Sequence, residues 1–195
     1  EYKYSNMQRL QAYKFELMPT GDQARDMRRF AGSCRFVFNK ALALQKTNHE
    51  AGEKFIGYVA MAKCLTDWRN NAATAWLKDS PVHSLQHTLK DLDRAYKNFF
   101  AKRSGFPKFK RRGGGESFRY PDSKQFELDQ ANARIKLPKL GWVRYRKSRD
   151  VEGELRNITV SQTCGKWSIS IQTQREEPDP IHAQEGTWIG LDLGA

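Results

Sequence analysis

Apolar and polar residues alternate near the beginning of the chain. In the stretch QAYKFELMP, Tyr13, Phe15 and Leu17 fall on one face of an extended chain, and charged residues fall on the other. This period of two predicts a half-buried strand that ends at Pro19. Thr20 follows directly, and because threonine is a common helix cap, a helix is expected from residue 21.

From residue 21 the apolar positions recur every three or four residues, which predicts an amphipathic helix over 21–45. A weaker helix is expected over 55–68, with Val59, Ala62 and Leu65 facing inward. The apolar face of the first helix consists of Met27, Phe30, Ala31, Cys34, Val37, Phe38 and Ala41.

A third helix is predicted over 80–103. Ser80 and Pro81 suit the N-cap and the first helical position. Gly105 and Pro107 end the pattern. The apolar face of this helix consists of Leu85, Leu89, Leu92, Tyr96 and Phe99.

The period changes again beyond the third helix. The stretch FKRRGGGESFRYP is a glycine-rich, basic connection, for which a flexible linker is favoured over a phosphate-binding loop because no Walker sequence follows. Short alternating segments then predict strands over 134–137, 142–146, 155–161 and 166–173. Cys164 and Gly165 indicate the turn of a hairpin between the last two. An acidic, proline-containing linker follows, and WIGLDLGA at 188–195 is typical of a buried strand.

Composition excludes some classes of protein. No apolar run is long enough to span a membrane, and the N-terminal residues lack the apolar stretch of a secretory signal. The three cysteines are far apart and form no CxxC pair, which favours a reducing cytoplasm and predicts no zinc site within these residues.

The positive charge is concentrated in one quarter of the chain. The net charge is +12, from 34 basic and 22 acidic residues. Between Lys102 and Arg149 there are 15 basic residues and four acidic ones, so this segment alone carries +11. Such a density of charge repels itself unless a polyanion is near, and a phosphate backbone is the commonest polyanion.

Aromatic residues are interleaved with these cations in FPKFKRR and WVRYRKSR. On the predicted strand 142–146, Val143 and Tyr145 share one face, while Arg144 and Arg146 share the other. A row of guanidinium groups can follow phosphates, and aromatic rings can stack on unpaired bases. The alternative is a solvated basic surface with its aromatic residues in the core. The composition favours nucleic-acid binding.

Two further patterns carry weaker chemical signals. His83 and His87 are one helical turn apart, with Asp91 a turn further on, but ordinary surface histidines are favoured over a metal site because no cysteine joins them and no HExxH motif is present. Asp192 in GLDLG is placed either to hold Mg²⁺ on a strand or to cap a turn at the strand's end. The motif alone leaves both interpretations open.

Several of these stretches, taken in order, resemble a known family. SCRFVFNKALALQ, LQHTLKDLDRAYKNFF, GFPKFKRRGGGESFRY and IKLPKLGWVRYR resemble the N-terminal half of the transposon-encoded TnpB (OrfB-type) proteins, which are compact relatives of the type V CRISPR effectors. RNITVSQTCGKWSISIQTQ resembles the hairpin that ends their wedge domain, and WIGLDLG resembles the first strand of their RuvC nuclease domain. The resemblance runs from about Gln11 to the last residue.

The resemblance implies an α+β fold. A small, OB-like β-barrel (the wedge) would be interrupted by a three-helix recognition insert and followed by the first strand of an RNase H-like (RuvC) domain. The implied divisions are 1–20 for the first wedge strand, 21–104 for the helical insert, 105–178 for the wedge barrel, 179–187 for a linker and 188–195 for the start of the nuclease domain.

The resemblance also implies site residues. Asp192 matches the first catalytic aspartate of a nuclease site. In the family, this site holds Mg²⁺ with further carboxylates that come later in the sequence than these 195 residues. Tyr58 and Gln86, with Ser123 and Lys124 from a wedge loop, match residues that face the target-adjacent motif in DNA. The candidates for RNA phosphate contacts are Lys108, Lys110, Arg111, Arg112, Arg144 and Arg146.

The implied partners are a structured guide RNA and a target double-stranded DNA, with no membrane and no small-molecule substrate. The expected location is the prokaryotic cytoplasm, at the nucleoid when DNA is bound. Three hypotheses stay open: a piece of an RNA-guided DNA endonuclease, a shortened nuclease-free RNA-guided binder that acts like a repressor, and a protein-only DNA-binding transposase domain. The third is disfavoured because the excess charge lies outside the predicted helices.

Overall fold

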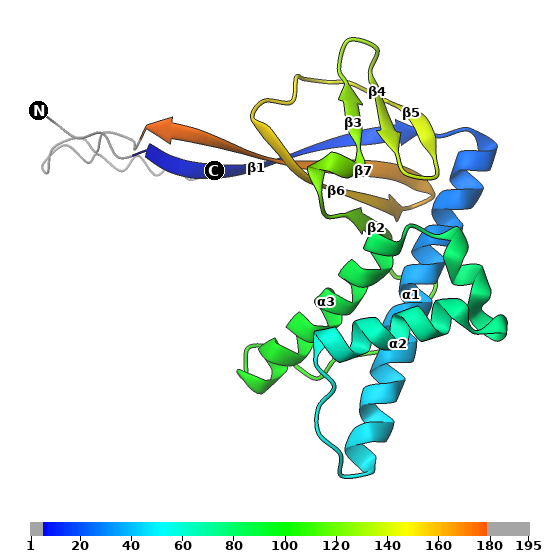
Figure 1. The fold of residues 1–195 in the computed structure, drawn as a ribbon. Coiled ribbons are helices and arrows are strands. Elements are labelled where there is room, and N and C mark those ends of the chain that lie inside the picture. The colour runs from blue at the N-terminus through cyan, green and yellow to red at the C-terminus, as the bar shows by residue number, and fades with distance from the viewer. Residues whose placement is uncertain (1–5, 179–195) are drawn as a thin grey trace, which may run out of the picture.

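The computed structural model describes residues 6–178, which form a strand, a helical region and then a series of strands. The helical region comprises α1 (Gly21–Glu50), α2 (Tyr58–Asn70), the 3₁₀ helix η1 (Ala72–Asp79) and α3 (Val82–Phe100). The strands are β1 (Asn6–Met18), β2 (Glu116–Tyr120), β3 (Glu127–Asp129), β4 (Arg134–Leu137), β5 (Gly141–Tyr145), β6 (Glu154–Thr163) and β7 (Lys166–Pro178), with a short 3₁₀ helix η2 (Ser123–Gln125) after β2. The helices gather on one side of the sheet, with α1 leaving it at the end of β1 (Figure 1).

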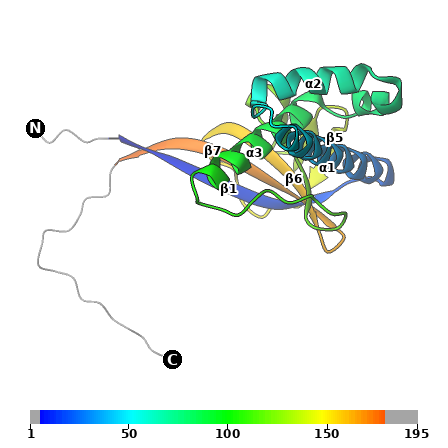
Figure 2. The same cartoon turned by 90° about the horizontal axis from the view of Figure 1, so that it is seen from below.

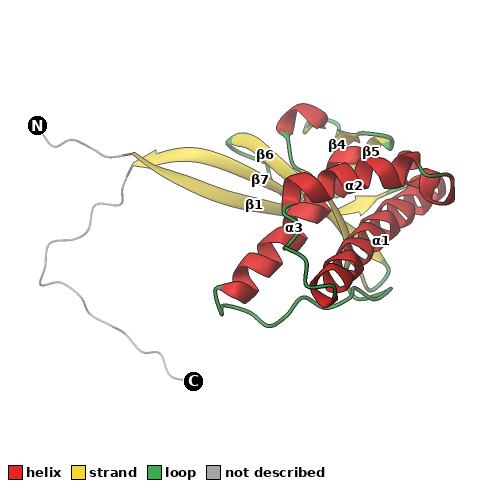
Figure 3. Ribbon diagram, turned by 60° about the horizontal axis from the view of Figure 1, so that its bottom comes forward, coloured by secondary structure: helices red, strands yellow, loops and turns green. Residues whose placement is uncertain are grey.

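All seven strands belong to one antiparallel sheet in the order β2-β6-β7-β1-β5-β4-β3. The long strand β1 joins its two halves, since it pairs with β7 from Asn6 to Glu16 and with β5 through Leu17 and Met18. The far ends of β1 and β7 project from the rest of the sheet as a two-stranded ribbon (Figures 2 and 3).

The predicted β-barrel does not close. Within the described residues the outermost strands β2 and β3 do not pair with each other, and both are short. The hydroxyl of Tyr120, at the end of β2, instead donates to the carbonyl of Pro138 between β4 and β5, at 3.0 Å. On its helical side β2 packs against α1 and α3. A side-chain contact and helix packing thus replace the ladder that a barrel requires.

The predicted periodicity of β1 and α1 is confirmed. Tyr13, Phe15 and Leu17 are buried, as are all seven predicted apolar positions of α1. Thr20 forms a capping box with Gln23, in which each side chain bonds the other residue's backbone N–H. Each fully buried large apolar side chain contributes about 2 kcal/mol to folding, so this face dominates the attachment of α1.

Three details of the helical prediction are wrong. The helix expected from residue 55 begins at Tyr58, and Val59 is 70% exposed rather than inward. Pro81, not Ser80, is the N-cap of α3. The Ser80 hydroxyl is buried and donates to the hydroxyl of Ser33 on α1 at 2.7 Å. The hydroxyl that was predicted to cap α3 therefore makes a tertiary contact instead.

All four predicted strands are present, and the hairpin turn at Cys164 and Gly165 is confirmed by their positive φ values of 49° and 77°. Strand β7 continues to Pro178, so it takes in REEP (175–178), the first residues of the acidic, proline-containing stretch REEPDPIHAQEG that was expected to be a linker. The predicted strand 188–195 lies outside the described residues. No helix within 6–178 is long and apolar enough to cross a membrane.

Candidate nucleic-acid interface

The basic segment after α3 lies against α1. Asn39 of α1 makes two hydrogen bonds with the backbone of Lys110: its amide donates to the carbonyl at 2.9 Å, and its oxygen accepts from the N–H at 2.8 Å. The Lys110 ammonium lies 4.3 Å from the centre of the Phe38 ring. Earlier in the segment, the Lys46 ammonium lies 4.8 Å from the ring of Phe109. We call residues 106–112 the basic strap, and these contacts hold it along the helix.

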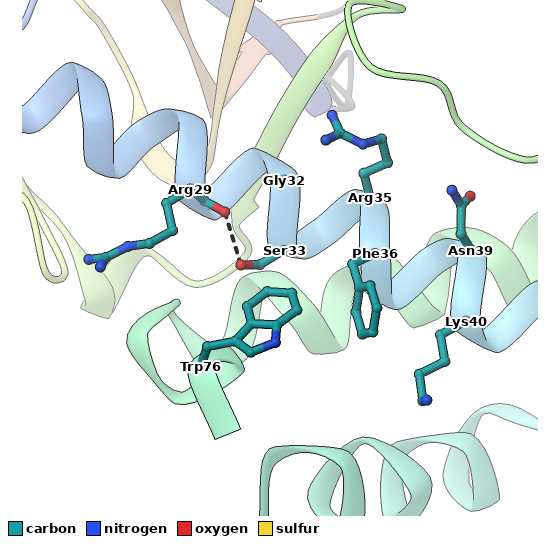
Figure 4. Close-up of a pocket in the computed structure, with 8 residues that line it drawn as sticks. All are labelled: Arg29, Gly32, Ser33, Arg35, Phe36, Asn39, Lys40 and Trp76. Carbon is teal, nitrogen blue, oxygen red and sulfur yellow. Dashed lines mark hydrogen bonds between the residues drawn. The ribbon is translucent and has the colours of Figure 1, made fainter. Parts of the chain in front are cut away.

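A groove follows the exposed face of α1 beside the strap. It has a volume of about 640 Å³, and it is lined by Arg29, Gly32, Ser33, Arg35, Phe36, Asn39, Lys40 and Trp76 (Figure 4). We call it the α1 groove. Trp76 of η1 meets Phe36 edge to face, with ring centres 5.0 Å apart. The Lys40 ammonium lies between two rings, 5.8 Å from Phe36 and 5.3 Å from Trp68. The groove therefore combines aromatic rings with three cations.

The charges in the α1 groove are not equally available. Arg29 pairs with Asp26 at 3.0 Å and with Asp79 at 3.6 Å, and Arg35 pairs with Glu116 at the start of β2. Lys40 makes no ion pair with a residue of the described part of the chain. The four cations of the strap also make no ion pair within residues 6–178; they are Lys108, Lys110, Arg111 and Arg112. The positive potential of the groove therefore comes mainly from Lys40 and from the strap.

The second group of predicted RNA contacts lies at the end of β5. Val143 and Tyr145 are buried while Arg144 and Arg146 are exposed, so the predicted alternation of this strand is confirmed. Arg146 is tied to β1, because its N–H donates to the Glu16 carbonyl at 2.8 Å and its guanidinium lies 3.6 Å from the Glu16 carboxylate. Arg144 makes no ion pair within residues 6–178 and lies opposite Arg134 in the ladder.

The six predicted RNA contacts thus fall into two groups rather than one row. Lys108 to Arg112 accompany α1, whereas Arg144 lies on β5 and Arg146 directly follows that strand. Of the 15 cations between Lys102 and Arg149, only four pair with a described carboxylate: Arg134, Lys136, Arg146 and Lys147. The remaining cations leave most of the excess charge free to meet phosphates.

A further basic hollow, of about 380 Å³, lies at the end of the sheet between η2 and the β4–β5 turn. Its cations are Lys124, which was predicted, and Lys136 and Lys139, which were not. The Lys139 ammonium donates to the Lys78 carbonyl at the end of η1, two residues beyond Trp76. Sequence reasoning missed these lysines because no local pattern brings the β4–β5 turn beside η1.

The residues matched to motif recognition lie where the helices meet one another and the sheet. The ammonium of Lys90 on α3 lies 5.3 Å from the ring of Tyr58 on α2, and Gln86 is one helical turn before Lys90. The Ser84 hydroxyl of α3 donates to the Arg119 carbonyl of β2 at 2.8 Å. Because β2 ends just before η2, this bond holds the start of α3 near Ser123 and Lys124. Lys90 was not predicted; it is a further cation at this junction, and only the packing of α2 on α3 reveals it.

Candidate metal ligands are sparse in the described part of the chain. His87 Nδ1 lies 3.4 Å from the Asp91 carboxylate, while His83 is exposed. Within residues 6–178 no group of three or more histidine, cysteine or acidic side chains is placed to hold a metal ion. Asp192, the predicted magnesium ligand, lies outside the described residues.

One family model matches part of the chain. Residues 7–54 match HTH_OrfB_IS605, which is described as a helix-turn-helix domain. In the structure, these residues form the strand β1 and the single helix α1, which has 30 residues. The matched region is therefore a strand and one long helix.

Three curated proteins are similar to this chain. "Putative RNA-guided DNA endonuclease InsQ" of Escherichia coli (strain K12) is 60% identical over 96% of this chain and 46% of its own length. "Putative RNA-guided DNA endonuclease" of Streptomyces pristinaespiralis is 30% identical over 94% of this chain and 46% of its own length. "Virulence protein VsdF" of Salmonella dublin is 31% identical over 54% of this chain and 96% of its own length.

The chain spans about half the length of the two relatives that bear the endonuclease name. The match to InsQ extends over nearly all of this chain, and the match to the OrfB model covers β1 and α1. Together with the motifs found in the sequence, these similarities show that the chain belongs to the transposon-associated OrfB (TnpB) family.

Proposed function

We propose that this chain is the guide-RNA-binding and DNA-recognising part of an RNA-guided DNA endonuclease. The names of the two long relatives support this proposal. In such systems, base pairing between the guide and the target reads the sequence, while the protein grips the backbones and reads a short adjacent motif. The protein therefore needs cations that meet phosphates without regard to sequence.

The observation that carries the proposal is the basic strap bound along α1. The Asn39 side chain bonds both the N–H and the carbonyl of Lys110, so the cations of the strap are held in a fixed position beside the groove. None of its four cations is neutralised by a carboxylate within residues 6–178. Unneutralised, positioned cations are what binding by counterion release requires. We assign the strap, Arg144 and Arg146 to the phosphates of a structured guide RNA.

The helix–sheet junction is the proposed reader of the target-adjacent motif. Tyr58 and Gln86 from the helices, with Ser123 and Lys124 from η2, would face the DNA duplex there. The cation–π contact between Lys90 and Tyr58 supports this assignment, since it places a charge that suits a DNA phosphate beside an aromatic side chain.

We assign cleavage to a chain of the full length of the two long relatives. Asp192 is proposed as the first carboxylate of the nuclease site. With Mg²⁺ bound, such a site supplies a metal-activated nucleophile and stabilises the leaving oxygen of the scissile phosphate. Replacing Asp192 with alanine in a chain extended to the relatives' length should abolish DNA cleavage and leave RNA binding unchanged.

A protein-only mode of DNA binding through a helix-turn-helix receives less support. That motif needs two helices joined by a short turn, with the second placed in the major groove. Residues 7–54, which match the helix-turn-helix model, contain one helix that follows a strand. The RNA-guided proposal is therefore favoured.

The test is to purify the chain from cells that carry its transposon end and to sequence the nucleic acid that accompanies it. We expect a structured RNA of defined length, with a binding constant that falls steeply as salt rises. Heparin serves as the control polyanion. Equal affinity for heparin and for the RNA would overturn the proposal.

A further inference from the structure

Gly32 is a glycine in the middle of α1 that the structure of this chain does not require. Its φ is not in the left-handed region, and a methyl group built on it would meet only the Arg35 guanidinium, at 3.8 Å. Inside a helix, glycine is less favourable than alanine because it loses more backbone freedom on folding. Neither backbone conformation nor internal packing accounts for it. What it leaves is open space over the floor of the α1 groove (Figure 4).

The exposed side chain of Trp76 also lines the groove. Trp76 is 42% exposed although it is a large apolar side chain. Its interplanar angle with Phe36 is 64°, so the two rings meet at an edge rather than stack. In an edge-to-face pair, one ring keeps a face free for another planar group. Figure 4 shows Phe36 and Lys40 extending from α1 on the side where Trp76 lies.

The volume and charge of the groove indicate the class of ligand. The groove is open to solvent along one side, and its volume of about 640 Å³ is large enough to receive one planar group. No carboxylate lines the groove, and of its three cations Lys40 makes no ion pair within residues 6–178, whereas Arg29 and Arg35 are paired with carboxylates outside the lining. A planar group with an attached anion matches this combination, and a nucleotide within a nucleic-acid strand is such a group.

A second aromatic pocket at the far end of the helices fits this ligand less well. It includes Phe55, Tyr96, Phe99 and Phe100, whose rings pack closely on one another. It is also lined by two carboxylates, those of Glu50 and Glu53, beside one lysine, Lys46. The α1 groove has no carboxylate in its lining, so it is the better site for a phosphate-bearing strand.

We infer that the α1 groove receives one unpaired base of a bound strand, stacked on Trp76 above Gly32, with the adjacent phosphate near Lys40. The inference deepens the proposed function and rests on it, since that function supplies the strand. Guide RNA and displaced single-stranded DNA both offer unpaired bases, so the chemistry is shared and the experiment separates the two sources.

The experiment compares binding of labelled oligonucleotides to the 195-residue chain. The probes are oligoadenylate RNA of about 12 nucleotides, the same RNA with abasic positions, and the corresponding single-stranded DNA. We expect the chain to prefer the intact RNA over the abasic RNA by about tenfold, which is the usual effect of one stacked base. The intact RNA and the DNA arms show which strand supplies the base.

Two pairs of variants test the site. Trp76→Leu should remove the preference for intact RNA, while Trp76→Phe should keep most of it because a ring remains. Gly32→Leu should also remove it by filling the floor, while Gly32→Ala should keep it. Both Gly32 variants retain every cation, so the salt dependence of binding should not change. Thermal unfolding identifies any variant that fails to fold, and each pair includes a conservative change.

The outcomes separate the two proposals. If folded Trp76→Leu and Gly32→Leu bind intact RNA as well as the unmodified chain does, or if that chain ignores abasic positions, the stacking site is wrong and the proposed function stands. If the unmodified chain binds none of the probes and no cellular RNA, both proposals are overturned.

Discussion

The side chain of Asn39 clamps the backbone of Lys110 with two hydrogen bonds, donating at 2.9 Å and accepting at 2.8 Å across 71 residues of sequence. Asparagine can satisfy a backbone N–H and a carbonyl together because its amide carries a donor and an acceptor. The contact converts a glycine-rich basic connection into a surface of fixed position. It is the link between the helical region and the cations that the sequence alone assigns to a connecting segment.

Replacing Asn39 with alanine should therefore release the strap. We expect RNA affinity to fall several-fold, because the strap's cations would lose a fixed position before binding and ordering them would cost conformational entropy. The loss of two exposed hydrogen bonds should lower the free energy of unfolding by about 1 kcal/mol. Hydrogen exchange at the Lys110 amide and an RNA titration are the two measurements.

Asn48→Ala is the matched control, since Asn48 lies on the same helix and its side chain also donates to a backbone carbonyl, that of Lys54. This variant should leave RNA affinity unchanged. An equal loss of affinity in both variants would show that the clamp on Lys110 has no special role.

Arg144 and Arg146, at the end of β5, should differ in their effect on the salt dependence of RNA binding. Arg144 has no carboxylate partner within residues 6–178, whereas Arg146 lies 3.6 Å from Glu16. Replacing Arg144 with glutamine should reduce the slope of log affinity against log salt by about 1. The same change at Arg146 should reduce it less. Arg9→Gln, at a cation paired with Glu177 on the projecting ribbon, is the control and should leave the slope unchanged.

The turn between β3 and β4 should make a defined contribution to acid sensitivity. Hydrogen bonds from the Asn132 side chain, the Arg134 guanidinium and the Asn132 backbone lower the pKa of Asp129 from 3.8 to about 2. Above pH 3.8 the carboxylate is ionised in both states, and its stabilising effect is complete. As the pH falls from 3.8 to about 2, the unfolded chain takes up the proton first, so this stability is lost.

Urea unfolding between pH 2 and pH 5 measures this contribution. Asp129→Asn should be less stable than the unmodified chain at pH 5, and the difference should shrink as the pH falls towards 2. In a chain that carries Arg134→Gln, the loss of stability caused by Asp129→Asn at pH 5 should be smaller, since one of the bonds to the carboxylate is already absent. A difference that is constant with pH would contradict the assignment.

The cysteines should react at very different rates. Burial raises the pKa of Cys34 to about 11, while Cys164 is exposed at the tip of the β6–β7 hairpin. Because the thiolate is the reactive form, labelling with a thiol reagent at about pH 8 should be at least on the order of a hundredfold slower at Cys34 than at Cys164. Cys164→Ser should remove the fastest phase, so that the half-buried Cys64 reacts next and Cys34 reacts last. Rapid labelling of Cys34 in the folded chain would place it outside the core.

The elements with a clear period were predictable. In β1 and α1, neighbouring positions already decide which face is apolar, so Tyr13, Phe15 and the seven apolar residues of α1 were identified correctly as core. The hairpin at Cys164 was predictable for the same reason, because its turn depends on two adjacent residues. In contrast, β3 has only three residues, too few to show a period, and β2 lies within the glycine-rich stretch that was interpreted as a linker.

Residues whose role depends on distant partners could not be assigned. Ser80 has the properties of a helix cap, but its hydroxyl is used by Ser33. Val59 fits an inward helical position, but no other element covers it, and it stays exposed. Gly32 has no local signal of function, since a glycine in a helical pattern acquires meaning only when the space above it is known.

The sequence by itself determined the family, the order of strand, helices and strands, and the concentration of positive charge in one segment, because these depend on residue identity and on near neighbours. Only the tertiary structure decided that the sheet stays open, that the predicted RNA contacts form two groups, and that the basic strap lies against α1 at Asn39. The physical reason is that each of these relations is made by contacts between residues far apart in the chain. Such contacts form only when the whole fold brings the partners together.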